Sequence, residues 1–140
     1  MNSDFNIALH ALVFLDHEDR ELSSAALAEN ICAHPTRVRK ILSRLGQSGL
    51  ILTKEGRFNG GYRMGKRADR ISLREVCEAV GTCFASTNWK SGDPRMKCLV
   101  ASGMAGIMDE LYGKLDETCK KELEKISVKD IENKIFREGT

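Results

Sequence analysis

The chain has 140 residues, of which 41% are hydrophobic and 30% charged, which is enough for one compact domain or for a small domain with an extension. Its five cysteines are odd in number and irregularly spaced, which excludes a disulfide framework. The apolar run at residues 11–15 is too short to cross a membrane, and no secretion signal opens the chain. We therefore expect a cytoplasmic protein that does not contact a membrane.

The net charge of +2 is unevenly distributed along the chain. Residues 34–70 contain ten basic and two acidic side chains, a net charge of +8, whereas the rest has 12 basic and 18 acidic ones, a net charge of −6. One concentrated basic region on an otherwise acidic protein is typical of polyanion binding. A merely solvated basic face would have the same composition, so the geometry of this segment decides between the two.

Three helices are predicted in the first third of the chain. The first is expected to begin at Ser3 or Asp4, and the second, capped by a serine, covers residues 23–31. The third covers residues 35–45 and has Pro35 in its first turn, where the missing N–H is no loss. The short interval between the second and third helices predicts a helix-turn-helix.

The third helix has two distinct faces. Apolar residues at spacings of three and four are expected to face inward: Val38, Ile41, Leu42 and Leu45. The residues left to face outward are polar or basic: Thr36, Arg37, Arg39, Lys40 and Ser43. A polar, basic outer face on the second helix of a helix-turn-helix is what a recognition helix in the DNA major groove requires.

A hairpin is predicted after the third helix. Residues 50–54 and 62–64 read as strands, and the glycine-rich loop between them permits a flexible tip. Arg57 lies on that tip, where an arginine can enter the minor groove and sense its negative potential. Helix, turn, helix and hairpin together predict a winged helix-turn-helix.

Three further helices are predicted in the second half of the chain: two short ones and, between them, a long one. A capping box at residues 72–75 opens a helix that Gly81 ends, and residues 82–97 are irregular. Apolar residues then recur at spacings of three and four, which predicts an amphipathic helix of about 25 residues. Such a helix is too long to bury against this domain alone, so we expect a homodimer. The interface is expected to include Met104, Met108, Leu111 and Leu115.

The predicted fold is therefore mainly α with a small β-hairpin wing and a long C-terminal dimerisation helix. We divide it into a DNA-binding domain (1–81), a sensor-type loop (82–98), and the long helix with a short final helix (99–140). No nucleophile–base pattern, phosphate loop or paired carboxylates are present, so an enzyme is not expected. The alternative is a winged-helix scaffold that binds a protein partner, although a scaffold has no need of an outward basic helix.

The sequence resembles the IscR/NsrR/CymR family of bacterial winged-helix transcriptional regulators, also called the Rrf-two family. The segments that carry the resemblance are residues 2–5, 8–10, 27–29, 35–42, 49–51, 60–63, 71–73 and 98–100. It implies a homodimer formed through the long helix, either by domain swapping or by pairing of the two helices. The dimer is expected to bind a palindromic operator as a transcriptional regulator, and repression is the expected mode.

The resemblance also implies roles for individual residues. Arg39 matches a position that contacts base edges, and Arg57 matches a minor-groove arginine of the wing. Phosphate or base contacts are expected from the remaining DNA-binding set: Thr36, Arg37, Lys40, Tyr62 and Arg63.

Some members of the family hold an iron–sulfur cluster between three closely spaced cysteines and a further ligand. Here only Cys83 and Cys98 flank the loop, and only Cys98 matches a family cysteine, whereas Ala101 occupies a ligand position. We therefore expect no metal and no cofactor, although two cysteines per subunit could still form a site across a dimer. Cys98, near the start of the long helix, is a candidate thiol sensor, or it only packs; an unknown small molecule is the other possible effector.

Overall fold

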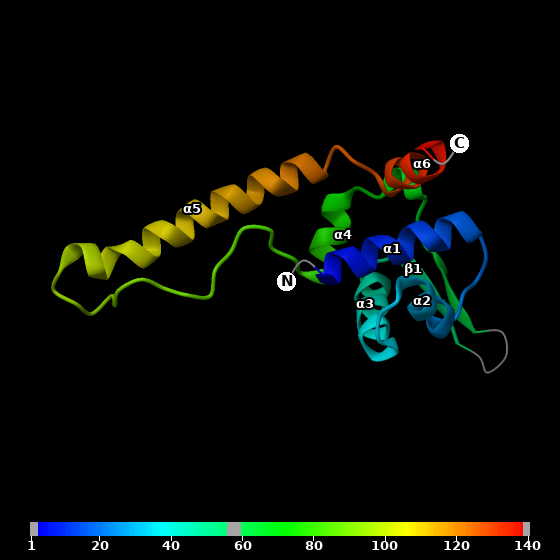
Figure 1. Cartoon of the computed structure of the whole chain (residues 1–140), viewed down its shortest axis with the longest axis horizontal. Helices are drawn as coiled ribbons and strands as arrows, with labels where there is room; N and C mark the ends of the chain where they lie inside the picture. The colour runs from blue at the N-terminus through cyan, green and yellow to red at the C-terminus, as the bar shows by residue number, and fades with distance from the viewer. Residues whose placement is uncertain (1–2, 56–59, 139–140) are drawn as a thin grey trace.

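The computed structural model describes residues 3–55 and 60–138 (Figure 1). Its elements are α1 (Ser3–Glu18), α2 (Ser24–Ile31), α3 (Pro35–Gln47), β1 (Ile51–Lys54), β2 (Gly61–Met64), the 3-10 turn η1 (Ala68–Arg70), α4 (Leu73–Val80), α5 (Leu99–Leu123) and α6 (Val128–Glu138). The structure thus has the predicted mainly helical fold with one two-stranded antiparallel hairpin.

The hydrophobic core lies in a head formed by α1–α4, the hairpin and α6 (Figure 1). Helix α1 is central to it, because it contacts α2, α3, β2, α4 and α6. The largest fully buried side chains come from all parts of the head: Leu12, Leu15, Leu27, Val38, Leu42, Leu45, Leu50, Ile51, Ile71, Val76, Cys77 and Val128. The position of α3 is therefore fixed by packing against α1, α2 and α4.

Local capping explains where the helices begin and end. The Ser23 hydroxyl accepts a hydrogen bond from the N–H of Ala26 at 3.0 Å at the start of α2. Ser72 and Glu75 form the predicted capping box, with distances of 3.1 Å and 3.3 Å between each side chain and the other residue's N–H. Gly81 ends α4 with a left-handed φ of 67°, a backbone conformation that glycine adopts without steric strain.

The hairpin is tied to the segment between α1 and α2. Thr53 of β1 lies opposite Tyr62 of β2 in the antiparallel pair. Tyr62 also exchanges two backbone hydrogen bonds with Leu22, at 2.8 Å and 2.9 Å. A Cβ atom at Gly61 would lie only 2.9 Å from the Leu22 carbonyl oxygen, so this approach requires glycine. The wing therefore has a fixed base on the head.

Helix α5 extends away from the head as an arm (Figure 1). It contains 25 residues, and none of them is buried. Residues 82–98 run from the end of α4 to the far end of α5, so the arm consists of one long helix and one irregular segment (Figure 1). Within the described ranges, no helix is long and apolar enough to span a membrane.

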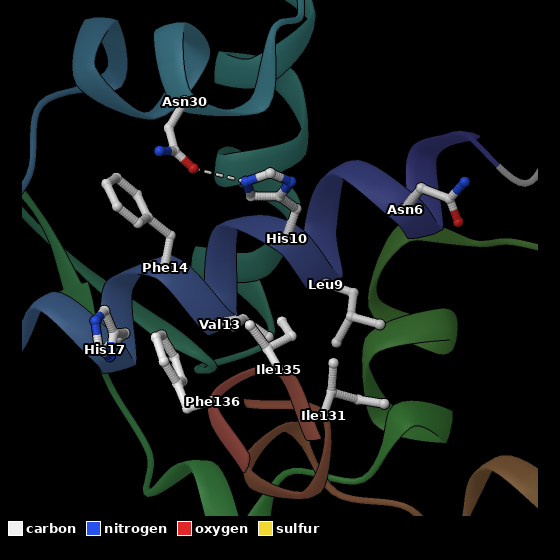
Figure 2. A pocket seen from close by; sticks show the side chains of 10 residues that line it. All are labelled: Asn6, Leu9, His10, Val13, Phe14, His17, Asn30, Ile131, Ile135 and Phe136. Atoms are coloured by element: carbon white, nitrogen blue, oxygen red, sulfur yellow. Dashed lines mark hydrogen bonds between the residues drawn. The ribbon is translucent and has the colours of Figure 1, made fainter. Parts of the chain in front are cut away.

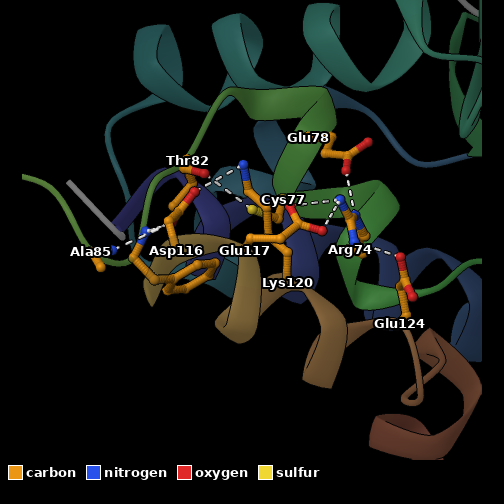
Figure 3. A network of polar contacts seen from close by, with 10 residues as sticks. Arg74, Cys77, Glu78, Thr82, Ala85, Asp116, Glu117, Lys120 and Glu124 are labelled. Carbon is orange, nitrogen blue, oxygen red and sulfur yellow. Dashed lines mark hydrogen bonds and ion pairs between the residues drawn. The ribbon is translucent and has the colours of Figure 1, made fainter. Parts of the chain in front are cut away.

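Ion pairs fix the base of α5 to α4 (Figure 3). The guanidinium of Arg74 in α4 donates to Glu78 at 2.6 Å and reaches two carboxylates of the α5 end. Its distance to Glu117 is 3.0 Å, and its distance to Glu124 is 2.5 Å. One arginine with three acidic partners thus joins α4 to the head end of α5.

A second contact joins the segment after α4 to the same part of α5 (Figure 3). The Asp116 carboxylate accepts hydrogen bonds from the N–H groups of Phe84 at 2.7 Å and Ala85 at 3.3 Å, and it lies 3.0 Å from the Lys120 ammonium. Although partial burial opposes ionisation, the Phe84 N–H and Lys120 hold the pKa of Asp116 below its ordinary value. Residues 84 and 85 are therefore anchored beside Asp116.

Helix α6 returns to the head. Val128 is fully buried, and its N–H donates to the Ile71 carbonyl oxygen at 2.9 Å, while the Leu73 N–H donates to the Ile126 carbonyl oxygen at 2.8 Å. The sequence-based division groups residues 99–140 as one unit, whereas the packing separates them. Helix α6 belongs with the head because Val128 completes its core, and the arm contains only α5 and residues 82–98.

Candidate nucleic-acid interface

A tight turn at residues 32–34 connects α2 to α3. Cys32 adopts a left-handed φ of 62°, and its N–H donates to the Ala28 carbonyl oxygen at 2.9 Å. His34 then caps α3, because its Nδ1 accepts from the N–H of Thr36 at 3.1 Å, and Pro35 occupies the first turn. This is the helix-turn-helix that the sequence predicts.

The two faces of α3 are as predicted. Its buried residues are Val38, Ile41, Leu42 and Leu45. Its exposed residues include the whole predicted outward set: Thr36, Arg37, Arg39, Lys40 and Ser43. A helix with one buried apolar face and one exposed basic face can contact the core and a polyanion at the same time.

Arg39 and Lys40 are cationic side chains of α3 that have no acidic partner within the described ranges. The Arg39 guanidinium makes one long hydrogen bond to the Thr36 hydroxyl at 3.4 Å, and no ion pair joins Arg39 or Lys40 to another residue of the described ranges. Arginine offers a planar fork of donors and lysine a compact charge. Both remain available to an external anion.

Arg37 lies on the flank of α3 that faces α1, and its surroundings differ from those of Arg39. Its guanidinium donates to the Asp4 carboxylate at 2.8 Å and to the Ser3 hydroxyl at 2.5 Å. Asp4 also lies 3.8 Å from the guanidinium of Arg44. Sequence reasoning missed this contact, because a partner 33 residues away leaves no local signal.

Three residues of the wing are predicted to contact DNA, and their surroundings in the structure differ. Tyr62 is half-buried and packs against the core, so it supports the wing. Arg63 is exposed and lines a shallow hollow with Asp19 and Glu21 at the end of α1. Arg57 lies outside the described residues.

Helix α5 has an uncovered apolar face, which we call the α5 stripe: Met104, Ile107, Leu111 and Leu115. Their exposed fractions are 37%, 62%, 47% and 47%. Ile107 was missed by sequence reasoning, although it lies three residues after Met104 and four before Leu111. Met108, also predicted at the interface, is half-buried, and it lines a small hollow with Trp89 of the irregular segment.

The head has an apolar groove between α1, α6 and the end of α2, which we call the head groove (Figure 2). Its volume is about 420 Å³, and its lining residues are Asn6, Leu9, His10, Val13, Phe14, His17, Asn30, Ile131, Ile135 and Phe136. His10 pairs with Asn30 at 2.7 Å, and the His17 ring stacks on Phe136 with centroids 4.0 Å apart. The groove follows α1 over about three turns, from Asn6 to His17 (Figure 2).

Cys98 is the N-cap residue of α5 and is exposed, as its place before the long helix predicts. The backbone N–H groups of Ala101 and Val100 lower the pKa of its thiol. Cys77 contrasts with it, because burial raises the pKa of that thiol. Cys98 is therefore the more reactive of these two cysteines.

Comparison with known proteins gives one family and consistent relatives. Residues 1–134 match the sequence model of Rrf2, described as an iron-dependent transcriptional regulator. A protein of Bacillus subtilis named as an HTH-type transcriptional regulator, YwnA, is 28% identical over 139 residues, which are 97% of this chain and 99% of that protein.

Solved structures agree on the fold. A transcriptional regulator from Lactobacillus plantarum superposes with a TM-score of 0.82 at 22% identity, over 99% of this chain and 93% of that one. CymR, the global cysteine regulator of B. subtilis, superposes with a TM-score of 0.67 at 16% identity, over 95% of each chain. The winged helix-turn-helix with a long C-terminal helix is therefore the fold of this chain.

The described residues do not fit an iron site within one chain. Cys83 immediately precedes Phe84, which is anchored to Asp116, whereas Cys98 caps the opposite end of the helix. The 17 residue-to-residue steps from Leu99 to Asp116 span about 26 Å of helix, so the two thiols cannot ligate one ion in the same chain. No group of three or more His, Cys, Asp or Glu side chains in the described ranges is arranged to hold a metal ion.

Proposed function

This chain belongs to the Rrf2 family and is a DNA-binding transcriptional regulator, and on that premise we propose that it acts as a homodimer on a palindromic operator. Occupation of a promoter by such a dimer would repress transcription. We place this activity in the bacterial cytoplasm, where the operator DNA lies. The relatives are transcriptional regulators, so a scaffold that binds only protein is not favoured.

The exposed basic face of α3 is the observation that carries this proposal. Arg39 and Lys40 project from a helix whose opposite face is locked into the core, and neither is ion-paired within the described ranges. Their orientation does not depend on a mobile loop, which is what a base-reading helix needs.

We assign different roles to these two cations. Arg39 would donate two parallel hydrogen bonds to a guanine edge in the major groove, since the arginine fork matches guanine O6 and N7. Lys40 would contact phosphate as a point charge, which adds affinity without sequence preference. Thr36, hydrogen-bonded to Arg39 at 3.4 Å, would limit the rotation of the arginine.

The wing would contact the neighbouring part of the duplex. Its base is fixed by the Leu22–Tyr62 backbone pair, and Arg63 is exposed beside it. Arg57 is proposed to enter the minor groove, where negative potential is concentrated. That role follows from its sequence position at the wing tip.

The α5 stripe supports a homodimer. Four apolar side chains between 37% and 62% exposed follow one another along an arm that the head does not cover. Exposed apolar surface of this extent is typical of an interaction site. Two copies of the stripe on antiparallel helices would cover each other, as a twofold dimer requires.

The head groove supports the same dimer. It is apolar and follows α1 over a length that suits a helix, and the arm of its own chain extends away from it (Figures 1 and 2). A partner arm that crosses the first α5 could place further apolar residues in this groove. Each head would then be held between its own arm and that of the partner.

The signal is proposed to act without an iron–sulfur cluster. Cys98 is an exposed thiol of lowered pKa at the start of the arm, so oxidation or alkylation there is chemically favoured. A change at the helix start could alter the arm and thereby the relative position of the two heads. A small molecule bound beside Trp89 is the other effector that we retain.

Fluorescence anisotropy tests the DNA-binding proposal. The probe is a duplex enriched from a randomised library by the purified protein, and the control is a scrambled duplex of the same composition. We expect a preference of about a thousandfold or more for the enriched duplex at physiological salt. Equal affinity for both duplexes would contradict sequence-specific binding.

A further inference from the structure

The first turn of α1 contacts the flank of the recognition helix. Asp4 Oδ1 accepts a hydrogen bond from Nη2 of Arg37 at 2.8 Å, and the Ser3 hydroxyl accepts from the same nitrogen at 2.5 Å. The other Asp4 oxygen lies 3.8 Å from Nη1 of Arg44, and this nitrogen donates to the Val80 carbonyl oxygen at 2.9 Å. The contact thus joins α1, α3 and the end of α4.

Asp4 and Ser3 hold Arg37 by one of its three nitrogens. Within residues 3–55 and 60–138, no hydrogen bond engages Nε or Nη1 of Arg37. The side chain is half-exposed, and it projects from the first turn of α3, one helical turn before Lys40. Its remaining N–H groups are therefore fixed in direction but free to donate.

We propose that Asp4 is a positioning residue for DNA binding: together with Ser3 it orients Arg37 so that its free N–H groups meet a phosphate beside the recognition helix. The proposal rests on the function proposed above, in which α3 lies in the major groove. A flexible arginine loses rotamer freedom when it binds, and an arginine already held in place loses less. Asp4 would thereby raise affinity although its own charge is negative.

Charge alone predicts the opposite effect. Removal of an acidic residue near DNA lessens repulsion of the phosphates and should strengthen binding to any duplex. Positioning predicts that the loss of Asp4 weakens binding, because Arg37 then samples other rotamers. The two explanations differ in the sign of one measurable change.

The test compares Asp4→Ala with Glu18→Ala, each in the wild type and in an Arg37→Ala background. Glu18 is a matched control, because it lies at the other end of α1 and contacts Arg20 at 3.4 Å. Affinity for the library-enriched duplex and its dependence on salt are measured by anisotropy, and the fold is checked by circular dichroism. Ser3→Ala is the second variant, since it removes one acceptor without a change in charge.

We expect Asp4→Ala to weaken binding by roughly ten- to a hundredfold, because the loss of one ordinary hydrogen bond, about three- to tenfold, occurs in each of the two heads. Arg37→Ala should weaken binding and reduce the slope of log affinity against log salt by about 1.8, the value for one phosphate contacted by each of the two heads. In the Arg37→Ala background, Asp4→Ala should weaken binding no further. Ser3→Ala should act in the same direction as Asp4→Ala, and Glu18→Ala should leave affinity within about twofold of the wild type.

Stronger or unchanged binding by Asp4→Ala in the wild-type background would overturn the inference. So would equal weakening with and without Arg37, because Asp4 would then not act through that residue. Arg39→Ala separates this failure from that of the proposed function. If Arg39→Ala loses affinity while Asp4→Ala does not, only the positioning role fails; if neither loses affinity, α3 is not the DNA-binding surface.

Discussion

We expect Leu111→Ala to weaken the dimer by about 30-fold. Leu111 is 47% exposed in the single chain, so about half of its side chain remains to be buried by a partner. Full burial of a leucine contributes roughly 2 kcal/mol, and the remaining half contributes about 1 kcal/mol. A twofold interface contains each residue twice, so the loss is about 2 kcal/mol, or about 30-fold in the dimer dissociation constant.

Sedimentation velocity over a concentration series measures this dissociation constant directly. Leu52→Ala is the matched control, because Leu52 is 46% exposed but lies on β1 in the wing rather than on the arm. The control should dimerise like the wild type. Equal dissociation constants for Leu111→Ala and Leu52→Ala would refute the α5 stripe as the interface, and a wild-type monomer at micromolar concentration would refute the homodimer itself.

Further predictions concern the recognition helix and the cysteines. Arg39→Ala should reduce discrimination between enriched and scrambled duplexes by about 1–3 kcal/mol. Lys40→Ala should weaken binding to both duplexes equally and flatten the salt dependence. If Arg39→Ala loses the same affinity for both duplexes, Arg39 does not contact the bases. Iodoacetamide at neutral pH should alkylate Cys98 before Cys77, as peptide mass spectrometry can follow, because the two thiols have opposite pKa shifts. Peroxide should change operator affinity in the wild type and not in Cys98→Ser; the same response in both would exclude Cys98 as the sensor.

Local features of the head could be predicted from the sequence because each is encoded over a few residues. The Ser72 capping box, the left-handed Gly81 and the start of α3 at Pro35 all lie where short-range patterns place them. The inward and outward faces of α3 follow from helical periodicity alone. These features depend on backbone hydrogen bonds and on the spacing of apolar residues, both of which can be read from a short window.

Tertiary contacts could not be predicted in this way. The Asp4–Arg37 contact joins residues 33 positions apart, and nothing near Asp4 indicates its partner. The return of α6 depends on the fit of Val128 into a core assembled from other elements. Met108 and Ile107 both satisfy helical spacing, and only the packing of the irregular segment near Trp89 decides which of them remains uncovered.

Footprinting of the enriched duplex by hydroxyl radicals, with the mass of the complex determined in parallel, tests the central proposal most directly. We expect two chains per duplex and two protected patches related by a dyad, with centres about 10 base pairs apart or at a multiple of that distance. Those patches would correspond to one α3 helix from each head. A single protected patch with one chain bound would contradict a homodimer on a palindromic operator.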